Sequence, residues 1–402
     1  MIHDCFDELP SELRHGVVSI GNFDGVHRGH RRLLARLRTR AQALGAPAIA
    51  VSFEPHPIAL LRPQFAPTPL VWPGRKAELL RAAGADGVII YQADHRLLDL
   101  EARAFFDDII RGRLQAVAMV EGPNFGFGKG RAGNVDTLRQ FCREATMPCD
   151  IVGLVEGEGE AVSSTRIRGA LREGEIEDAQ RMLGRPHRIR GKVVQGDQRG
   201  ATIGFPTANL ESIPVLVPKD GVYAVRVHVG ETPYAGACHV GTNPTFDQEK
   251  RKVEIHLLDY SGSLYGAWVE VDFLSRLRGT ERFADLAALK AQLAQDVDEV
   301  RRRVLTQEQE QERSSAARRA ELCSTISEWI MQEVEPSLRT TGGSFGSATL
   351  QDDGLLQLRW RFDRTPLPHE RQTLLFGLEQ QLRRVFPEVT AVTSTTDSMV
   401  ST

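Results

Sequence analysis

The sequence has few of the features that mark secreted and membrane proteins. Only five cysteines occur in 402 residues, at positions 5, 142, 149, 238 and 323, and no two are spaced as CxxC. This pattern argues against a disulfide framework and against a cysteine-rich zinc site. The first ten residues, MIHDCFDELP, have no apolar run, and no stretch reaches the ~18 apolar residues of a membrane helix. We therefore expect a cytoplasmic protein with no signal peptide and no membrane association.

The chain also lacks an excess of charge of one sign. Fifty Lys and Arg residues against 53 Asp and Glu residues leave a net charge of −3. No strong field is therefore expected that would attract nucleic acid or an acidic membrane. Hydrophobic residues make up 41% of the chain and charged residues 26%, which is ordinary globular composition, and the length predicts two or three domains.

Residues 1–185 alternate short apolar runs with helix-prone stretches. The apolar runs 17–20, 48–53, 87–91, 117–120 and 151–155 are typical of buried parallel strands. Helices are predicted between them over 31–44, 76–83, 103–114 and 136–144. This rhythm predicts a Rossmann-like, doubly wound α/β domain with helices on both faces of the sheet.

The pattern changes after Gly184-Arg185-Pro186. Residues 186–305 contain alternating apolar runs, at 225–229, 253–257 and 269–273, which predict a small antiparallel β-barrel closed by a helix over about 283–304. Residues 306–318 are polar and predict a linker or an exposed helix extension. Residues 319–395 combine helix and strand patterns, so a small α+β C-terminal domain is expected.

A segment rich in glycine and histidine follows the first predicted strand, GNFDGVHRGH at 21–30. Its glycines let the backbone approach a phosphate, and the N-terminus of the helix that follows attracts an anion. His27 and His30 lie three residues apart, so two imidazoles on one helical face can bind a triphosphate and stabilise charge at its α-phosphate. The other candidate phosphate-binding residues here are Gly21, Asn22, Phe23, Asp24, Gly25 and Gly29.

A second candidate phosphate-binding segment, SSTRIR at 163–168, follows the fifth predicted strand. Hydroxyl and guanidinium groups suit the phosphates that leave as pyrophosphate, which selects Ser163, Ser164, Thr165 and Arg168. An HxGH segment alone can arise by chance, and SSTR alone is commonly a helix N-cap. Because each follows a predicted strand and opens a predicted helix, the two together favour a nucleotidyl-transfer site.

These two segments resemble the adenylyltransferase half of the bifunctional bacterial riboflavin kinase/FAD synthetases. FEPHP at 53–57 and GPNFGFG at 122–128 support this likeness over other HxGH transferases. The resemblance implies a flavin pocket that includes Phe53, Asn124 and Phe125, in which Phe125 or Phe127 stacks on an aromatic ring and Asn124 forms hydrogen bonds with one. Proline and glycine in both segments also make ordinary turns without any ligand.

The barrel region carries a second glycine-rich segment, GDQRGATIGFPTANL at 196–210. It lacks the GxxxxGK[ST] pattern, but its glycines can cradle phosphates. Thr207 and Asn209 offer hard oxygen donors two residues apart, which suit Mg²⁺. Glu254 interrupts an apolar strand, and a carboxylate there can take a proton from a substrate hydroxyl, although a solvent-facing glutamate is the commoner explanation. The candidate phosphate-binding residues of this segment are Gly196, Gly200, Gly204 and Pro206.

GFPTANL, GVYAV, GTNPTF and EIHLLDY, in this order, resemble the riboflavin kinase domain of the same enzymes. The resemblance implies that Thr207 and Asn209 serve a Mg²⁺–ATP site, that Glu254 is the base on the ribityl 5′-hydroxyl, and that Arg278 and Glu281 lie near the flavin. It covers about 1–305 and departs from the family at Gln198, where a small residue is common. The implied activity is phosphorylation of riboflavin to FMN by ATP, then adenylylation of FMN to FAD with release of pyrophosphate.

Three alternatives stay open at this point. One of the two activities could be lost, although both motif sets are intact. Another HxGH adenylyltransferase, acting on pantetheine or nicotinate mononucleotide, would not need the GFPTANL barrel. A flavin-binding regulatory protein could use the C-terminal unit as its interaction module, although such a protein would usually lose a histidine of HxGH or the PTAN element.

Residues 319–395 resemble the C-terminal domain of NifU-like iron–sulfur scaffolds. The shared segments are EPSLRTTGGS, DGLLQLRW and TLLFGLEQQLRRVFPEV. Arg364 and Leu367 occupy the positions of that family's CxxC, so no cluster is expected, because assembly needs thiolates. Cys323 is expected in the core. The prediction is a degenerate scaffold that serves self-association or a protein partner, with a novel α/β cap as the alternative.

Overall fold

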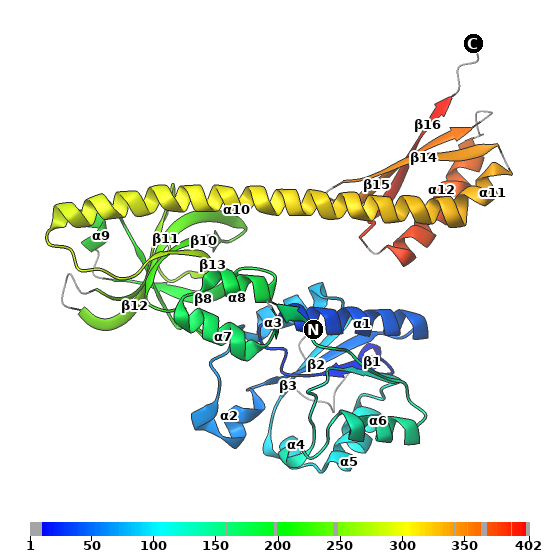
Figure 1. The fold of residues 1–402 in the computed structure, drawn as a ribbon, viewed down its shortest axis with the longest axis horizontal. Coiled ribbons are helices and arrows are strands. Elements are labelled where there is room, and N and C mark those ends of the chain that lie inside the picture. The colour runs from blue at the N-terminus through cyan, green and yellow to red at the C-terminus, as the bar shows by residue number, and fades with distance from the viewer. Residues whose placement is uncertain are drawn as a thin grey trace. The chain divides into compact units, whose positions relative to one another are not determined.

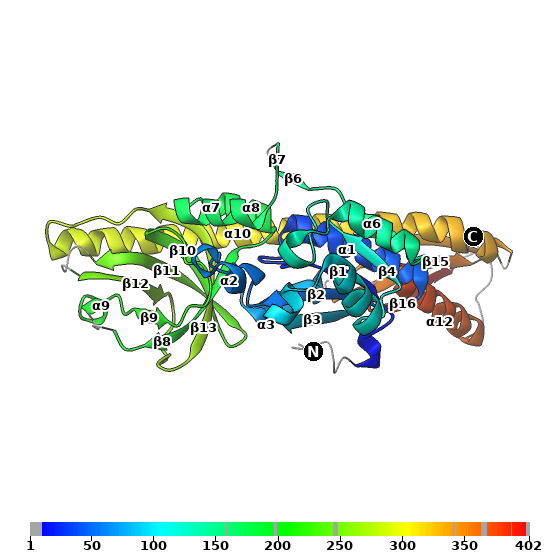
Figure 2. The ribbon, with the colours of Figure 1, turned by 90° about the horizontal axis from the view of Figure 1, so that it is seen from below.

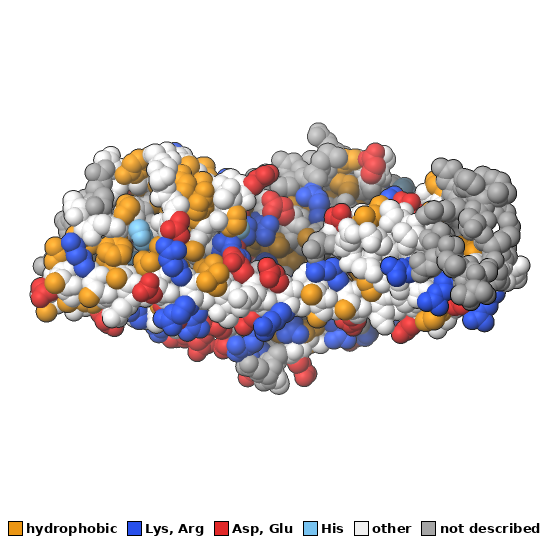
Figure 3. Space-filling view, turned by 90° about the horizontal axis from the view of Figure 1, so that it is seen from above, with side chains coloured by type: hydrophobic (Ala, Val, Ile, Leu, Met, Phe, Trp, Pro, Cys, Tyr) orange, Lys and Arg blue, Asp and Glu red, His pale blue; other side chains and the backbone are white. Residues whose placement is uncertain are grey.

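The computed structural model describes residues 10–157, 159–196, 199–243, 248–340, 342–351, 353–362, 368–386 and 388–398. The chain divides into two compact units, Met1–Val304 and Leu305–Thr402, whose elements are drawn in Figures 1 and 2. No helix in the described part of the chain is long and apolar enough to cross a membrane. On the face in Figure 3, acidic and basic side chains are interspersed, in keeping with the small net charge.

A five-stranded sheet, in which every neighbouring pair is parallel, forms the centre of the N-terminal part, in the order β3-β2-β1-β4-β5. Its strands are β1 (Val17–Ile20), β2 (Ala48–Glu54), β3 (Gly87–Gln92), β4 (Ala118–Glu121) and β5 (Cys149–Ile151). The first four agree with the predicted runs. β5 ends earlier than predicted, because the apolar run beyond it includes Leu154, which is exposed.

Helices cover both faces of this sheet, as the alternation of the sequence predicted. Val17 and Ala50 face α1 (Arg28–Leu44) and α3 (Pro73–Ala82), whereas Val18 and Ile49 face α6 (Val135–Glu144) and the π-helical segment η3 (Phe105–Arg113). Successive strand residues point to opposite faces, so each face has its own core. The shorter elements are α2 (Pro57–Leu61), α4 (His95–Leu98), α5 (Ala102–Ala104), the 3₁₀ turns η1 (Ser11–Leu13), η2 (Pro63–Phe65) and η4 (Lys129–Arg131), and the hairpin of β6 (Glu156–Gly157) and β7 (Glu160–Ala161).

The chain changes direction in this sheet between β1 and β4. It passes from β1 outward through β2 to β3, and then β4 returns to the other side of β1. Ligands of open parallel sheets bind beyond the carboxyl ends of the strands at such a point. Two contacts join the strand ends here: the Ser52 hydroxyl donates to the Asn22 carbonyl (2.9 Å), and the Ile20 N–H donates to the Glu121 carboxylate (2.7 Å).

A closed barrel follows, in the order β10-β11-β12-β9-β8-β13. Ile189, Tyr223 and Ile255 are among the residues that fill its core, and Leu171 and Met182 of the two preceding helices join the same cluster. The expected boundary between residues 185 and 186 lies in the connection from the second of these helices to the first barrel strand. The elements are α7 (Ser164–Glu173), α8 (Ile176–Leu183), β8 (His187–Val194), α9 (Arg199–Thr202), β9 (Ala208–Glu211), β10 (Gly221–Val229), β11 (Thr232–Asn243), β12 (Gln248–Leu257) and β13 (Trp268–Arg278).

A 44-residue helix, α10 (Leu286–Trp329), follows the barrel. Val300 and Val304 of its first half pack on Ala224 and Leu274 of the barrel, so it covers the outer face of β10 and β13 (Figure 1). Residues 306–318, expected as a linker or an exposed helix extension, are helical within α10.

The C-terminal unit has the α+β character that the sequence predicted. Its sheet has the order β14-β15-β16, with an antiparallel pair followed by a parallel pair. Its core includes Ile326, Trp360 and Leu382, and Cys323 packs against it, as expected. Arg364 and Leu367 lie outside the described residues. The elements after α10 are η6 (Ile330–Val334), α11 (Glu335–Arg339), β14 (Gly343–Leu350), β15 (Leu355–Phe362), α12 (Pro368–Val385) and β16 (Ala391–Ser398).

Candidate active sites

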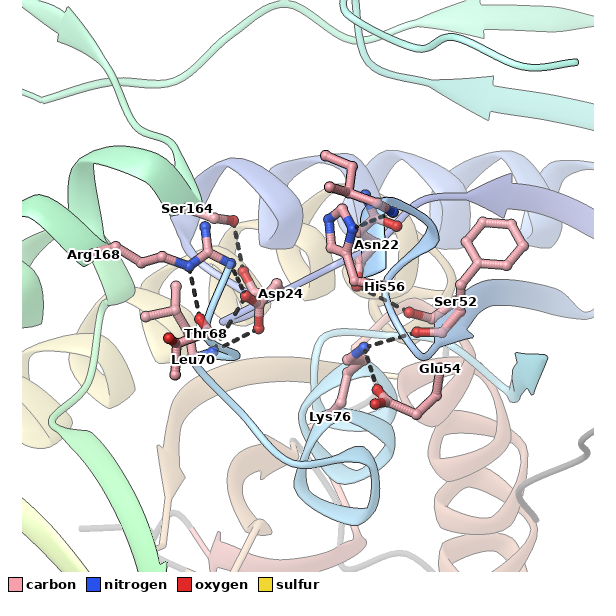
Figure 4. Close-up of polar contacts among 12 residues, drawn as sticks. Asn22, Asp24, Ser52, Glu54, His56, Thr68, Leu70, Lys76, Ser164 and Arg168 are labelled. Carbon is pink, nitrogen blue, oxygen red and sulfur yellow. Dashed lines mark hydrogen bonds and ion pairs between the residues drawn. The ribbon is translucent and has the colours of Figure 1, made fainter. Parts of the chain in front are cut away.

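The loop between β1 and α1 has an unusual backbone. Phe23, Gly25 and Val26 have positive φ values of 46°, 82° and 39°. This region is unfavourable for side chains with a Cβ, most of all a β-branched one, so the surroundings must hold the loop in place. The Asp24 carboxylate accepts the Leu70 N–H (2.9 Å) and pairs with the Arg168 guanidinium (Figure 4).

The second predicted phosphate-binding segment meets this loop directly. The Ser164 hydroxyl donates to the Asp24 carbonyl (2.8 Å) across 140 residues of sequence. Ser163 caps α7, where its hydroxyl oxygen accepts the Arg166 N–H (3.3 Å), and Thr165 is exposed. The structure thus brings together the two segments that the sequence assigned to one site, at the carboxyl edge of β1.

Arg168 has a different environment from the one expected of a phosphate ligand. Its Nε donates to the Thr68 carbonyl (2.8 Å), and its terminal nitrogen forms the ion pair with Asp24. Both side chains are more than nine-tenths buried. The guanidinium and the carboxylate are therefore engaged in holding the loop, and a direct contact of either with a triphosphate stays a prediction.

His27 and His30 lie together at the start of α1. Their rings stack with centroids 3.7 Å apart, and His27 Nδ1 accepts the His30 N–H (3.4 Å). A Cβ at Gly29 would lie 3.1 Å from the His27 ring, so this position favours glycine. The His27 bond leaves the imidazole proton on Nε2, which can donate to a ligand. His30 Nδ1 is buried, and no hydrogen-bond partner for it is found in the described chain.

Burial keeps both histidines neutral near pH 7. Burial, and then the charge of Arg185, lower the pKa of His27 to about 4. Burial, His27, Lys76 and Arg185 hold the pKa of His30 well below its usual value. The imidazoles therefore act on a phosphate as hydrogen-bond donors rather than as cations.

Lys76 and Arg185 are the charged groups around the histidines that the sequence did not reveal. The Lys76 ammonium on α3 is 4% exposed, donates to the Phe53 carbonyl (3.4 Å) and lies 3.7 Å from a Glu54 oxygen; burial lowers its pKa. Its position next to Ala77 on the buried face of a predicted helix is a signal that sequence reasoning could have used, because lysine is rarely buried without a role.

The expected flavin residues of this half lie at neighbouring strand ends. Phe53 lies within the last two residues of β2, and Asn124 and Phe125 follow β4, on either side of the loop after β1. Phe127 is 4% exposed and belongs to the core, with the Phe125 ring stacked on it (5.3 Å). Phe125, which is partly exposed, is therefore better placed than Phe127 to meet an aromatic ligand.

The barrel places its candidate residues in one row on the outer face. Asn209 of β9 lies opposite Glu254 of β12, which lies opposite His239 of β11. Residues directly opposite in an antiparallel pair have Cβ atoms about 4.5–5.5 Å apart. Val253 and Ile255 point into the core, so Glu254 points outward. The row continues through Val222 of β10 to Arg278 of β13.

The glycine-rich segment folds onto this row. A Cβ at Gly196 would overlap the Asn209 amide, and one at Gly200 would overlap the Phe205 carbonyl and lie 3.4 Å from Thr207 Oγ1. Position 200 therefore requires glycine, whereas a side chain at position 196 would displace the Asn209 amide. The glycines lie beside the two expected oxygen donors. Gly204 has a φ of 94°, a backbone conformation that favours glycine. The Pro206 carbonyl accepts a hydrogen bond from the His256 ring (2.8 Å). Gln198 lies outside the described residues.

Arg278 lies at the far end of the row, and Glu281 follows it by three residues in the chain. The Arg278 guanidinium forms a two-point ion pair with Asp296 of α10 (3.0 and 2.8 Å), and Asp296 is 4% exposed. Glu281 is exposed. The structure thus gives Arg278 an anchoring contact to the helix, and its contact with a flavin stays a prediction.

His239 was not predicted as a site residue, since only the strand register places it beside Glu254. Burial lowers its pKa, and its Nδ1 is buried without a partner in the described chain. No group of three His, Cys, Asp or Glu side chains in the described ranges could hold a metal ion. Thr207 and Asn209 each supply a side-chain oxygen, which fits a Mg²⁺ ion that takes its remaining ligands from ATP phosphates and water.

Comparison with known families gives a consistent result for both halves. The family model described as FAD synthetase matches residues 9–166, and the one described as riboflavin kinase matches residues 183–304. Neither family model extends beyond residue 304, and the likeness of the C-terminal unit to NifU-like scaffolds stays a prediction.

Curated relatives named bifunctional riboflavin kinase/FMN adenylyltransferase match most of the chain. The Pseudomonas fluorescens protein is 39% identical over 290 residues, covering 72% of this chain and 93% of the relative. The Escherichia coli K12 protein is 38% identical, with 70% and 90% coverage, and the Bacillus subtilis protein is 31% identical, with 72% and 93% coverage. A Streptococcus pneumoniae crystal structure titled macrolide-efflux protein is 30% identical, with a TM-score of 0.68, and covers 75% of this chain and 98% of its own.

Proposed function

This chain belongs to the bifunctional riboflavin kinase/FMN adenylyltransferase family, and we infer that it phosphorylates riboflavin to FMN and then adenylylates FMN to FAD, with ATP as co-substrate in both steps. The adenylyltransferase comprises residues 1–185 and the kinase residues 186–305. Riboflavin, FMN and ATP are the expected small-molecule partners. One observation carries the assignment of sites: in each half, segments distant in sequence meet, Ser164 with Asp24 in the first and Asn209 with Glu254 in the second.

In the adenylyl step, a phosphate oxygen of FMN attacks the α-phosphorus of ATP, and pyrophosphate leaves. The nucleophile is already an anion, so no strong base is needed. Neutral His27 and His30 donate hydrogen bonds to the phosphates where charge develops. Ser163, Ser164, Thr165 and the loop glycines complete the phosphate site, and Phe53, Asn124 and Phe125 hold the flavin.

In the kinase step, Glu254 accepts the proton of the ribityl 5′-hydroxyl as that oxygen takes the γ-phosphoryl group of ATP. Thr207 and Asn209 hold the metal–nucleotide at the next position of the row, so the row aligns base, hydroxyl and phosphate. Mg²⁺, when bound, neutralises charge on the transferred phosphate. Arg278, at the end of the same row, and Glu281, three residues after it, contact the flavin.

Two proposals concern the rest of the protein. The C-terminal domain, residues 319–395, serves self-association or a protein partner. The described thiol of that unit, Cys323, packs against the core and accepts the Leu350 N–H, so it is not placed to bind an iron–sulfur cluster. A cytoplasmic location fits four described cysteines that are all unpaired.

A single incubation tests the function. The purified protein is mixed with riboflavin, ATP and Mg²⁺, and the flavins are separated by chromatography over time. FMN that rises and then gives way to FAD supports both activities. FMN alone would leave only the kinase, and bound but unchanged riboflavin would favour the regulatory alternative.

A further inference from the structure

Arg185 lies in the connection between the two halves, after α8 and before β8. Its guanidinium donates to three carbonyl oxygens, those of Gly25 (2.5 Å), Val26 (3.1 Å) and Leu183 (3.3 Å). None of the ion pairs found among the described residues includes Arg185. This arginine therefore serves as a backbone clamp on the loop that precedes His27.

The two carbonyls that Arg185 holds belong to the strained part of that loop. Gly25 and Val26 both have positive φ, and Val26 is β-branched. Such a backbone persists only where several contacts determine it. Asp24 is held from one side by Ser164 and Arg168, and Arg185 holds the next two residues from the other side. His27 follows immediately, so its ring position depends on where this backbone lies.

Arg185 itself is anchored by the barrel. Two residues later, the buried His187 ring contacts the Leu216 carbonyl (2.7 Å), and Arg188 pairs with Asp272 of β13 (2.6 Å). The backbone that carries Arg185 is therefore fixed by the kinase half, while its side chain fixes a loop of the adenylyltransferase half.

The charge of Arg185 acts on the same histidines. Burial is the largest cause of both lowered pKa values. The charge of Arg185 adds to it for His27, and the His27 ring, Lys76 of α3 and Arg185 add to it for His30. Protonation of His27 Nδ1 would remove the acceptor of the His30 N–H and disrupt the start of α1. A cation beside the loop opposes that protonation.

We propose that Arg185 is a positioning residue for adenylyl transfer: its guanidinium holds the Gly25 and Val26 carbonyls so that His27 and His30 meet the ATP phosphates. The proposal rests on the inferred adenylyltransferase activity. The connection between the halves would thus act in FMN adenylylation and not in riboflavin phosphorylation.

Three variants separate the hydrogen bonds of Arg185 from its charge. Arg185→Ala removes both. Arg185→Lys keeps the charge but loses the planar guanidinium with its several donors, and Arg185→Gln keeps a hydrogen-bond donor but loses the charge. Arg181→Ala, an exposed arginine of α8 whose pair is Asp178, is the matched control. FMN adenylylation and riboflavin phosphorylation are measured on each protein as functions of pH, with thermal unfolding as the check of folding.

The Ala variant should lose about 10²-fold in adenylylation kcat, as expected for a misplaced catalytic group, and the Lys variant about tenfold. Kinase kcat should stay within about twofold of wild type, and Arg181→Ala should match wild type in both. The acid limb of the adenylylation profile should move to higher pH in the Gln and Ala variants and stay in place in the Lys variant.

Wild-type adenylylation kcat and an unshifted acid limb in both Ala and Gln variants would overturn the proposal. If the Arg185→Ala variant unfolds and loses both activities, the test rests on Arg185→Lys and Arg185→Gln. Identical pH profiles of adenylylation for these two variants would also overturn the proposal. A wild-type protein that makes FMN but no FAD would instead remove the adenylyltransferase activity on which the proposal rests.

Discussion

The Asp24 carboxylate and the Arg168 guanidinium form a buried ion pair across 144 residues, between the loop after β1 and the helix α7. Both residues belong to motifs expected to bind phosphate, and the structure shows that each holds the other. The pair joins the two motifs of the adenylyltransferase half to each other.

Arg168→Met should therefore destabilise the protein as well as slow FAD formation. It leaves a buried carboxylate without its partner, which typically costs about 3–5 kcal/mol of unfolding free energy. Urea unfolding with intrinsic fluorescence measures the loss. Lys219→Ala, which breaks the exposed pair with Glu173, is the control and should change stability little. A loss below about 1 kcal/mol for Arg168→Met would contradict a stabilising role of the pair.

Stability should fall as the pH drops from about 6.5 to about 4, because His27 has its pKa lowered to about 4 in the folded protein. Between these pH values His27 binds a proton in the unfolded chain but not in the folded one. The contribution of His27 to the unfolding free energy is therefore fully present above its pKa in the unfolded chain, and it is lost as the pH falls. His187, whose pKa burial also lowers to about 4, adds to the same slope.

His27→Asn isolates the contribution of His27, since asparagine is a good N-cap but does not titrate in this range. The variant should take up about one proton fewer on unfolding at pH 5 than the wild type does. The measurement is the unfolding free energy against pH. An unchanged slope would show that His27 titrates normally in the folded state.

Lys76→Met should slow FMN adenylylation by about 10–10³-fold while leaving riboflavin phosphorylation unchanged. Among the described residues, the buried Lys76 ammonium contacts the Phe53 carbonyl at 3.4 Å and a Glu54 oxygen at 3.7 Å, and its charge lowers the pKa of His30. Lys76 is therefore placed to meet a phosphate oxygen. Lys129→Met, at an exposed lysine, is the control. The measurement is the steady-state rate of FAD formation from FMN and ATP. A wild-type rate for Lys76→Met would show that Lys76 takes no part in adenylylation.

His239→Ala should impair the kinase only. The imidazole lies opposite Glu254 in the strand ladder, and its buried Nδ1 has no partner in the described chain, so a substrate hydroxyl or carbonyl is the fitting partner. We expect KM for riboflavin to rise about tenfold, the effect of about one lost hydrogen bond to a ligand. KM for FMN in adenylylation should not change. The control is Thr232→Ala at an exposed site. If His239→Ala and this control have the same KM for riboflavin, His239 has no role in riboflavin binding.

Local patterns predicted much of the architecture. The first four parallel strands, the barrel and the segments of both sites follow from apolar alternation and from residue spacing, which are local properties. The run 151–155 failed because Leu154 is apolar yet exposed, which periodicity alone does not reveal. Residues 306–318 continue α10, which agrees with the helix extension and not with the linker, the two alternatives that the sequence left open.

The contacts that define the sites depend on partners far away in the sequence. The motifs do not reveal that Arg168 pairs with Asp24 or that Arg278 pairs with Asp296. The phosphate contact expected of Arg168 and the flavin contact expected of Arg278 stay predictions. Arg185 is visible in the sequence only as part of a domain boundary. His239 becomes a site residue through the register of β11 and β12, which no local pattern specifies.

The most direct test of two independent sites in one chain is a comparison of His30→Ala with Glu254→Gln, alone and mixed, each supplied with riboflavin, ATP and Mg²⁺. His30→Ala should accumulate FMN with FAD formation reduced at least about 10²-fold, and Glu254→Gln should make little FMN but convert added FMN to FAD. The mixture should restore FAD formation from riboflavin, because FMN released by one variant is the substrate of the other. Equal loss of both products in either variant, with the fold intact, would contradict the account.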